Sequence, residues 1–265
     1  MSKMNEKPNT PLVVAHRGAS KIAPENTLKA FQKAIELKAD FIEFDVQQSK
    51  DHELVITHDE DLTRLTGYRK TVESLTLKEL KKLNFGEGEK IPTFEELIKL
   101  VKGKIGLNCE IKVPNIAEIV INLIRVNCII DSTIISSFLH EELLKIKKVD
   151  PKIKIAALVP TSGVKELNWE EKRRMIDFCI ENDFYAINPL VMMVDQEFVN
   201  YAHDHNIKIY PWTVDVKITI KKLLKYGVDG IITNDIILLQ TLINDFKLKI
   251  KEKKNGIIFP NQNRE

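Results

Sequence analysis

Residues 13–27 read VVAHRGASKIAPENT, and this stretch shows how the whole chain is organised. Three small apolar residues indicate a buried strand, and His16, Arg17 and Gly18 follow where that strand must end. A segment with apolar residues at helical spacing begins at the end of the stretch. A buried strand, a polar turn and an amphipathic helix together make one β/α unit.

The turn itself raises expectations about individual residues. Gly18 lets the backbone approach a ligand because it has no Cβ. Glu25 and Asn26 are placed to satisfy the exposed amides at the start of the helix. Glu25 is also placed to brace Arg17, and the sequence leaves these two roles for Glu25 open.

The β/α unit recurs along the chain. Short apolar runs alternate with amphipathic segments, and each run is apolar enough to be covered on both faces. Eight units in 265 residues predict a closed (β/α)8 barrel, whereas no GxGxxG follows the first strand to indicate a doubly wound sheet. The expected strands are LVVAH (12–16), FIEFDV (41–46), IGLNCEIKV (105–113), TIISSF (133–138), KIAALV (154–159), FYAINPL (184–190), KIYPWTV (208–214) and GIITN (230–234).

One connection is much longer than the others. About residues 50–101 separate the second and third barrel strands, which predicts a small insertion over the barrel mouth. Within it, LVITH indicates an extra strand. TLKE and TFEE have the spacing of capping boxes, so we expect helices to start near Thr76 and Thr93.

Composition indicates an ordinary globular protein with a small-molecule partner. The chain is 43% hydrophobic and 29% charged, and its formal net charge of +2 gives no field that favours nucleic acid. We find neither a secretory signal nor the roughly 20 apolar residues of a membrane span, so we expect a cytoplasmic protein without stable membrane insertion. One barrel domain is expected over residues 11–247, with polar termini at 1–10 and 248–265.

Carboxylates gather at the carboxyl ends of two expected strands. Side chains alternate along a strand, so Glu43 and Asp45 share one face, and Glu110 and Lys112 share another. Because the carboxyl ends of barrel strands meet at one mouth, the three carboxylates come together. Such a cluster binds a hard divalent cation, Mg²⁺ or Ca²⁺, or else it is a buried network neutralised by Arg17 and Lys112.

Two histidines favour a catalytic interpretation of this cluster. His16 ends the first strand, and His58 follows the apolar run LVIT. Two imidazoles beside carboxylates indicate proton transfer, because imidazole exchanges a proton near neutral pH. With a bound cation and the fixed charges of Arg17 and Lys112, this set of groups suits a phosphoryl centre and predicts phosphodiester cleavage.

The order of these motifs resembles that of the glycerophosphodiester phosphodiesterases. HRG, PENT, E-x-D, HD and E-x-K follow one another, and the LTRLTG of the insertion and the later WTV also look like that family. The resemblance implies a TIM barrel that hydrolyses glycerophosphodiesters to an alcohol and sn-glycerol 3-phosphate. It implies one divalent metal ion and a role for each candidate residue. These roles are metal ligation by Glu43, Asp45 and Glu110, acid–base catalysis by His16 and His58, and substrate binding by Arg17, Lys112 and Trp212.

Alternatives to this function stay open on the sequence. A related barrel phospholipase or lysophospholipase would use the same histidines and release a cyclic phosphate. A non-catalytic barrel would bind glycerophosphodiesters without needing two proton-transfer groups. A sugar-phosphate isomerase or aldolase would need a Schiff-base lysine or an enolising carboxylate, and Lys112, the obvious candidate, would stay protonated beside a metal and a phosphate. Asp215 after WTV and the ITND of the last strand depart from the family pattern, and we expect them to affect recognition of the alcohol and the closing turn.

Overall fold

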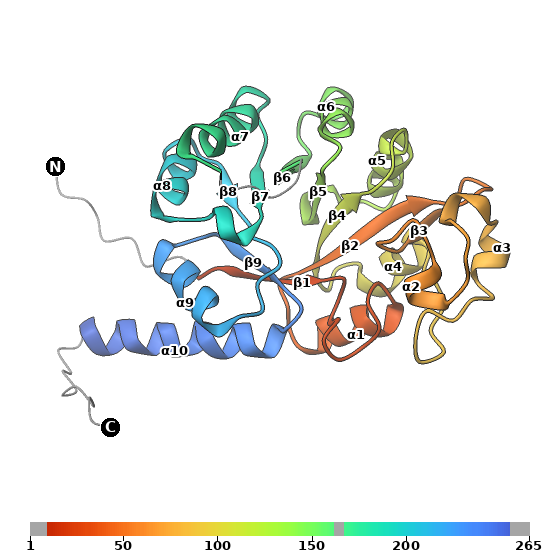
Figure 1. Ribbon diagram of the computed structural model, residues 1–265, viewed down its shortest axis with the longest axis horizontal. Helices are drawn as coiled ribbons and strands as arrows, with labels where there is room; N and C mark the ends of the chain where they lie inside the picture. The colour runs from red at the N-terminus through yellow and green to blue at the C-terminus, as the bar shows by residue number, and fades with distance from the viewer. Residues whose placement is uncertain (1–9, 162–166, 255–265) are drawn as a thin grey trace.

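Parallel strands and helices alternate along the chain in the computed structural model, which describes residues 10–161 and 167–254 (Figure 1). Hydrogen-bonded neighbours follow the order β8-β7-β6-β5-β4-β2-β1-β9. The barrel strands are β1 (Leu12–His16), β2 (Phe41–Gln48), β4 (Gly106–Ile111), β5 (Thr133–Ser137), β6 (Lys154–Val159), β7 (Ala186–Pro189), β8 (Lys208–Ile209) and β9 (Gly230–Thr233). Every expected strand is present, and the predicted (β/α)8 barrel is confirmed.

The barrel closes between its last two strands through irregular backbone. We expected a strand over residues 208–214, but the regular ladder of β8 ends at Ile209. Pro211 has no N–H to donate, so it interrupts the ladder. The Val214 N–H then donates to the Ile232 carbonyl (2.9 Å), and the Ile232 N–H donates to the Pro211 carbonyl (3.0 Å). These two bonds join the segment to β9 and close the barrel.

Helices pack around the outside of the strands (Figure 1). Phe44, which points outward from β2, lies 6.3 Å from Phe31 and 5.1 Å from Phe94 between ring centroids. The main hydrophobic core therefore lies between the strands and the helices, as in other barrels of this type. The covering helices are α1 (Leu28–Glu36), α4 (Phe94–Val101), α5 (Ala117–Val126), α6 (His140–Val149), α7 (Trp169–Glu181), α8 (Gln196–Asp204), α9 (Lys217–Tyr226) and α10 (Ile236–Lys254).

The last helix runs past the domain end that we expected. α10 continues to Lys254, beyond residue 247. Most of the expected polar termini, residues 1–9 and 255–265, lie outside the described residues. Across residues 10–161 and 167–254, no helix has both the length and the hydropathy that a membrane span requires.

The insertion forms a small layer of its own beside the barrel. β3 (Leu54–Ile56) pairs antiparallel with the end of β2, which confirms the extra strand. Thr76 and Thr93 each form a capping box, before α3 (Leu77–Leu80) and α4 respectively, as the spacing predicted. α2 (Thr63–Thr66) and the 3-10 turn η1 (Val72–Ser74) complete the layer. Its separate core consists of Val55, Leu62, Val72, Leu75, Leu80, Phe85 and Ile91.

The inside of the barrel changes from apolar to polar along its axis. Inward side chains such as Val14, Ala186 and Tyr210 form a small apolar cluster. Side chains two residues further along the strands, including His16 and Asn188, face the same interior nearer the carboxyl ends. The polar layer therefore lies at the mouth, where barrel enzymes carry their chemistry.

Candidate active site

Three buried carboxylates meet at the carboxyl end of the barrel. Glu43 and Asp45 come from β2, and Glu110 lies opposite Asp45 in the β2–β4 register. One oxygen of each carboxylate lies within 4.8 Å of the others. Glu110 is the most exposed of the three, at 8%. The structure thus brings together the three residues that alternation along the strands had predicted.

Two cationic side chains contact this cluster. Arg17 Nε lies 3.4 Å from Asp45 Oδ2, and the Arg17 main-chain N–H donates to Glu43 (2.9 Å). Lys112 Nζ lies 2.7 Å from Glu110 Oε1 and 3.5 Å from Asp45 Oδ1. Two fixed positive charges therefore face three carboxylates. A salt-bridge network alone leaves one negative charge uncompensated.

The carboxyl pKa values show the same surplus of negative charge. Burial, together with the charge of Asp45, raises the pKa of Glu110 to about 7. Burial and the charge of Asp45 also hold the pKa of Glu43 well above its usual range. Burial raises the pKa of Asp45 too, but Lys112 and Arg17 outweigh it, so that pKa lies below its usual range. Asp45 Oδ1 is buried and has no hydrogen-bond partner. An unpartnered oxygen among hard oxygen donors fits a divalent cation such as Mg²⁺ or Ca²⁺.

His58 is held by a chain of hydrogen-bonded side chains that starts in the insertion. Its Nδ1 lies 2.7 Å from Asp59 Oδ1, and Asp59 Oδ2 accepts from Arg64 Nε (2.5 Å). Arg64 also donates two hydrogen bonds to Glu25 (2.7 and 3.2 Å). The sequence did not single out Arg64, although it lies within LTRLTG, one of the motifs that carried the resemblance. The insertion therefore contributes directly to the site.

The PENT segment braces the site and leaves the capping to its last residue. Thr27 is the N-cap of α1. Glu25 accepts a hydrogen bond from Arg17 Nη1 (2.9 Å), and Asn26 donates to Asp45 Oδ2 (2.8 Å). Of the two roles left open for Glu25, the structure shows the contact with Arg17, and the expectation that Asn26 caps the helix is wrong because its side chain contacts Asp45.

The backbone conformation and the packing at residue 18 require a glycine. Its φ is +79°, a region that residues with a Cβ rarely adopt, and an added Cβ would lie 2.8 Å from the Ala30 backbone. The close approach of α1 explains the glycine, and the close approach to a ligand that we expected stays a prediction.

His16 is held from the opposite side of the mouth. Its Nδ1 lies 2.7 Å from Asn234 Oδ1, and Asn234 in turn donates two hydrogen bonds to Asp215. His16 Nε2 lies 4.0 Å from Glu43 Oε2. Burial lowers the pKa of His16, and the charge of Arg17 lowers it further. Asp215 and Asn234, which we expected to affect the alcohol, lie behind this imidazole.

A cavity of about 80 Å³ connects these groups. Charged and titratable side chains from Arg17, Glu43 and Glu110 line one part of it, with both histidines. Trp212 lines the other part, stands edge-on to Phe138 and donates from Nε1 to a main-chain carbonyl of β7. Lys112 is not among the residues that line this cavity, and it contacts Glu110 and Asp45 beside it.

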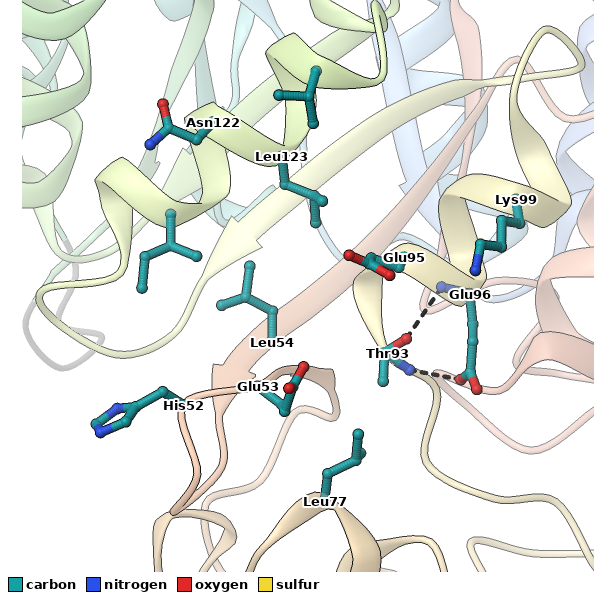
Figure 2. A pocket seen from close by; sticks show the side chains of 12 residues that line it. His52, Glu53, Leu54, Leu77, Thr93, Glu95, Glu96, Lys99, Asn122 and Leu123 are labelled. Carbon is teal, nitrogen blue, oxygen red and sulfur yellow. Dashed lines mark hydrogen bonds between the residues drawn. The ribbon is translucent and has the colours of Figure 1, made fainter.

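A larger hollow of about 500 Å³ lies elsewhere, between the insertion and the α4 and α5 helices (Figure 2). Its wall is largely apolar, with Leu54, Leu77 and Leu123 among its residues. Glu96, one of its acidic residues, is engaged in the capping box with Thr93. Of these two cavities, the smaller one has two imidazoles beside the buried carboxylate cluster, whereas the larger one has a single exposed imidazole, His52, so chemistry and not size identifies the candidate active site.

This fold and these side chains define a barrel hydrolase of phosphoric diesters. The model of the glycerophosphoryl diester phosphodiesterase family matches residues 16–238. The chain belongs to that family.

This chain covers most of the length of each of the following relatives. The chain is 42% identical over 246 residues to a glycerophosphodiester phosphodiesterase of Caldanaerobacter subterraneus subsp. tengcongensis, covering 88% of this chain and 96% of that protein. A glycerophosphodiester phosphodiesterase structure from Thermotoga maritima has a TM-score of 0.75 and 30% identity, covering 88% of this chain and 98% of that one. An Oleispira antarctica phosphodiesterase, solved with the product sn-glycerol-3-phosphate, has a TM-score of 0.78 and 26% identity, covering 89% and 97%.

Proposed function

We propose that this chain hydrolyses glycerophosphodiesters to an alcohol and sn-glycerol 3-phosphate, using one divalent metal ion held by Glu43, Asp45 and Glu110. The surplus of buried negative charge between two imidazoles is the observation that carries this proposal. The names of the relatives and the product bound to the Oleispira antarctica enzyme support the substrate class. Carboxylate ligands suit both Mg²⁺ and Ca²⁺, and either ion serves the proposal.

The fixed charges of the mouth orient the phosphoryl group. When bound, a divalent ion neutralises negative charge on the phosphoryl oxygens. Arg17 and Lys112, which contact the carboxylates on opposite sides, would each donate hydrogen bonds to those oxygens. Trp212 and Phe138, which stand edge to face, form an aromatic wall of the cavity.

The partners of the two imidazoles support different roles in proton transfer. Asn234 offers a neutral amide oxygen to Nδ1 of His16, so neutral His16 carries its proton there and presents a bare Nε2 to the cavity. Asp59 offers a carboxylate to Nδ1 of His58, which orients the ring. His16 would take a proton from the attacking water as the water oxygen bonds to phosphorus. His58 would protonate the leaving alkoxide as the P–O bond to the alcohol breaks.

Release of glycerol 3-phosphate from glycerophosphocholine tests this function. The purified chain is stripped of metal and supplied with Mg²⁺ or Ca²⁺, with His16→Ala and His58→Ala alongside. We expect each variant to bind metal and to lose roughly 10²- to 10⁴-fold in turnover, the usual contribution of one acid or base. His205→Ala is the matched control, because His205 is exposed and bonded to the Tyr201 carbonyl on α8.

Two outcomes would change the proposal. Full turnover by His58→Ala would show that the proton-transfer roles are misassigned. A cyclic phosphate as the final product, seen by phosphorus NMR, would favour the related phospholipase-type diesterase. The expected cytoplasmic location and the single domain over residues 11–247 stay predictions.

A further inference from the structure

One buried side chain of the barrel interior has no hydrogen-bond partner. Asn188 lies on β7 and is 0% exposed. Neither its amide nitrogen nor its amide oxygen has a partner, and it lines the cavity between the histidines and Trp212. A buried carboxamide that makes no hydrogen bond destabilises the fold, because it has lost water without a replacement. Such an exception calls for a partner that the protein itself does not supply.

Polar side chains close to Asn188 do have hydrogen-bond partners within the protein. Ser136 Oγ on β5 donates to Asn108 Oδ1 on the adjacent strand β4 (2.9 Å), so each of these two side chains has a partner within the protein. The Asn188 main-chain carbonyl accepts from Trp212 Nε1 (2.8 Å). Gln47 is another buried carboxamide of the described residues, and its Nε2 donates to two main-chain carbonyls. The backbone of Asn188 is therefore anchored while its side chain is left for a ligand.

The charged lining residues of the cavity come from β2, β4 and the end of β1, whereas Asn188 lies on β7, which pairs with β6 and β8. Arg17, Glu43 and Glu110 line the charged side, which suits a phosphoryl group. Apart from the two histidines, the rest of the lining is uncharged and consists of Asn108, Ser136, Phe138, Leu158, Asn188, Trp212, Thr213 and Ile232. A neutral part of the substrate must therefore meet the carboxamide.

The carboxamide also distinguishes between the two ends of a glycerophosphodiester. The aromatic pair Phe138 and Trp212 alone would suit a quaternary ammonium group. A trimethylammonium group has neither an N–H nor an oxygen, so it would leave Oδ1 and Nδ2 of Asn188 without hydrogen-bond partners. Two adjacent hydroxyls match the carboxamide, since one donates to Oδ1 and the other accepts from Nδ2.

We infer that Asn188 determines specificity by binding the vicinal diol of the glycerol half of the substrate. This inference rests on the proposed function, because it assumes that the phosphoryl group occupies the charged side. A site built to hydrogen-bond a hydroxyl discriminates strongly against an analogue that lacks it, since its buried polar atoms then stay unpaired.

Binding of two phosphate monoesters tests the inference without depending on turnover. Glycerol 3-phosphate carries the diol, and propyl phosphate lacks both hydroxyls. We expect the metal-loaded protein to bind glycerol 3-phosphate at least about tenfold more tightly, as measured by calorimetry. Asn188→Leu keeps the branch at Cγ but cannot form hydrogen bonds, so the two ligands should bind it equally.

Thermal unfolding separates a ligand-binding role from a structural one. Asn188→Leu should unfold at the same or a higher temperature than the wild type, because it removes an unpaired carboxamide. Gln47→Leu, the matched control, should unfold at a lower temperature, because it leaves two carbonyls unpaired.

Three results would overturn the inference. These are equal binding of the two ligands by the wild type, a preference for the diol that survives in Asn188→Leu, and a lowered unfolding temperature of Asn188→Leu. The last result would show that the carboxamide meets a structural water only. Release of glycerol 3-phosphate by the same wild-type preparation tests the proposed function separately. If turnover is present and one of these three results is obtained, only the inference about Asn188 fails.

Discussion

Buried charge occurs at both ends of this barrel, with different consequences. At the amino end, Asp229 accepts hydrogen bonds from His203 Nε2 and Lys208 Nζ (2.8 Å each) and from the Ile209 N–H (3.0 Å). Burial raises the pKa of Asp229, but these donors outweigh it and the pKa lies below its usual range. We call Asp229 with these donors the floor cluster.

At the carboxyl end, Glu43, Asp45 and Glu110 crowd together with Arg17 and Lys112, and we call these five residues the mouth cluster. Here burial and mutual repulsion raise two of the three carboxyl pKa values. A buried carboxylate with donors of its own stabilises the fold, whereas carboxylates without enough donors form a site for a ligand. The two clusters therefore predict opposite results of mutation.

The largest effect is expected when the mouth cluster loses a ligand. Glu110→Gln removes one of three carboxylates, so we expect weaker metal binding and a fall in kcat/KM of at least roughly 10³-fold. Its unfolding temperature without metal should not fall, because repulsion within the cluster decreases. Calorimetry, steady-state rates and thermal unfolding measure the three quantities. Unchanged metal affinity would remove Glu110 from the site.

The matched change in the floor cluster should act on stability alone. Asp229→Asn weakens the bonds to His203 and Lys208 and should lower the free energy of unfolding by about 2 kcal/mol. Metal affinity and turnover per folded molecule should stay at wild-type values. Denaturant titration and steady-state rates check both parts. A loss of turnover in the folded variant would contradict the division between the two ends.

A smaller effect is expected at Arg64, whose side chain links the insertion to the mouth. Arg64→Lys keeps the charge but loses the planar fork that contacts Asp59 and Glu25 together. We expect kcat to fall roughly tenfold, as for other groups that orient a catalytic side chain, while KM changes little. Arg69→Lys, on the same insertion and without an ion pair among the described contacts, is the control. A change in KM alone would indicate that Arg64 contacts substrate.

The smallest expected effect is a loss of folding stability at acid pH, caused by protonation of Asp229 in the floor cluster. The pKa of folded Asp229 lies below its unfolded value of about 3.9, so its stabilisation is complete above that value. It is lost as the pH falls through the folded pKa, when the carboxylate takes up a proton. The difference in unfolding free energy between wild type and Asp229→Asn should therefore shrink between about pH 5 and pH 3. A difference that stays constant over this range would contradict the assignment.

Local patterns along the chain sufficed to predict the fold and the centre of the site. Alternation along β2 put Glu43 and Asp45 on one face, and the carboxyl ends of the strands brought Glu110 and both histidines to the same mouth. The capping boxes at Thr76 and Thr93 were likewise local signals, and both are confirmed.

The supporting contacts could not be predicted in the same way, because they join distant parts of the chain. Arg64 and Glu25 are 39 positions apart, and His16 and Asn234 are 218 apart. No periodicity specifies such pairs. Asn188 did leave a signal, since it is a polar residue on the inward face of an otherwise apolar strand. Its lack of a partner is visible only in three dimensions.

The central claim is that the surplus charge of the mouth cluster binds a divalent cation that turnover requires. Titration of the metal-free protein with Mg²⁺ and with Ca²⁺, followed by calorimetry and by glycerol 3-phosphate release from glycerophosphocholine, tests it directly. We predict one ion per chain, turnover that rises with occupancy, and neither signal in Glu110→Gln. Full turnover in excess chelator would contradict the claim.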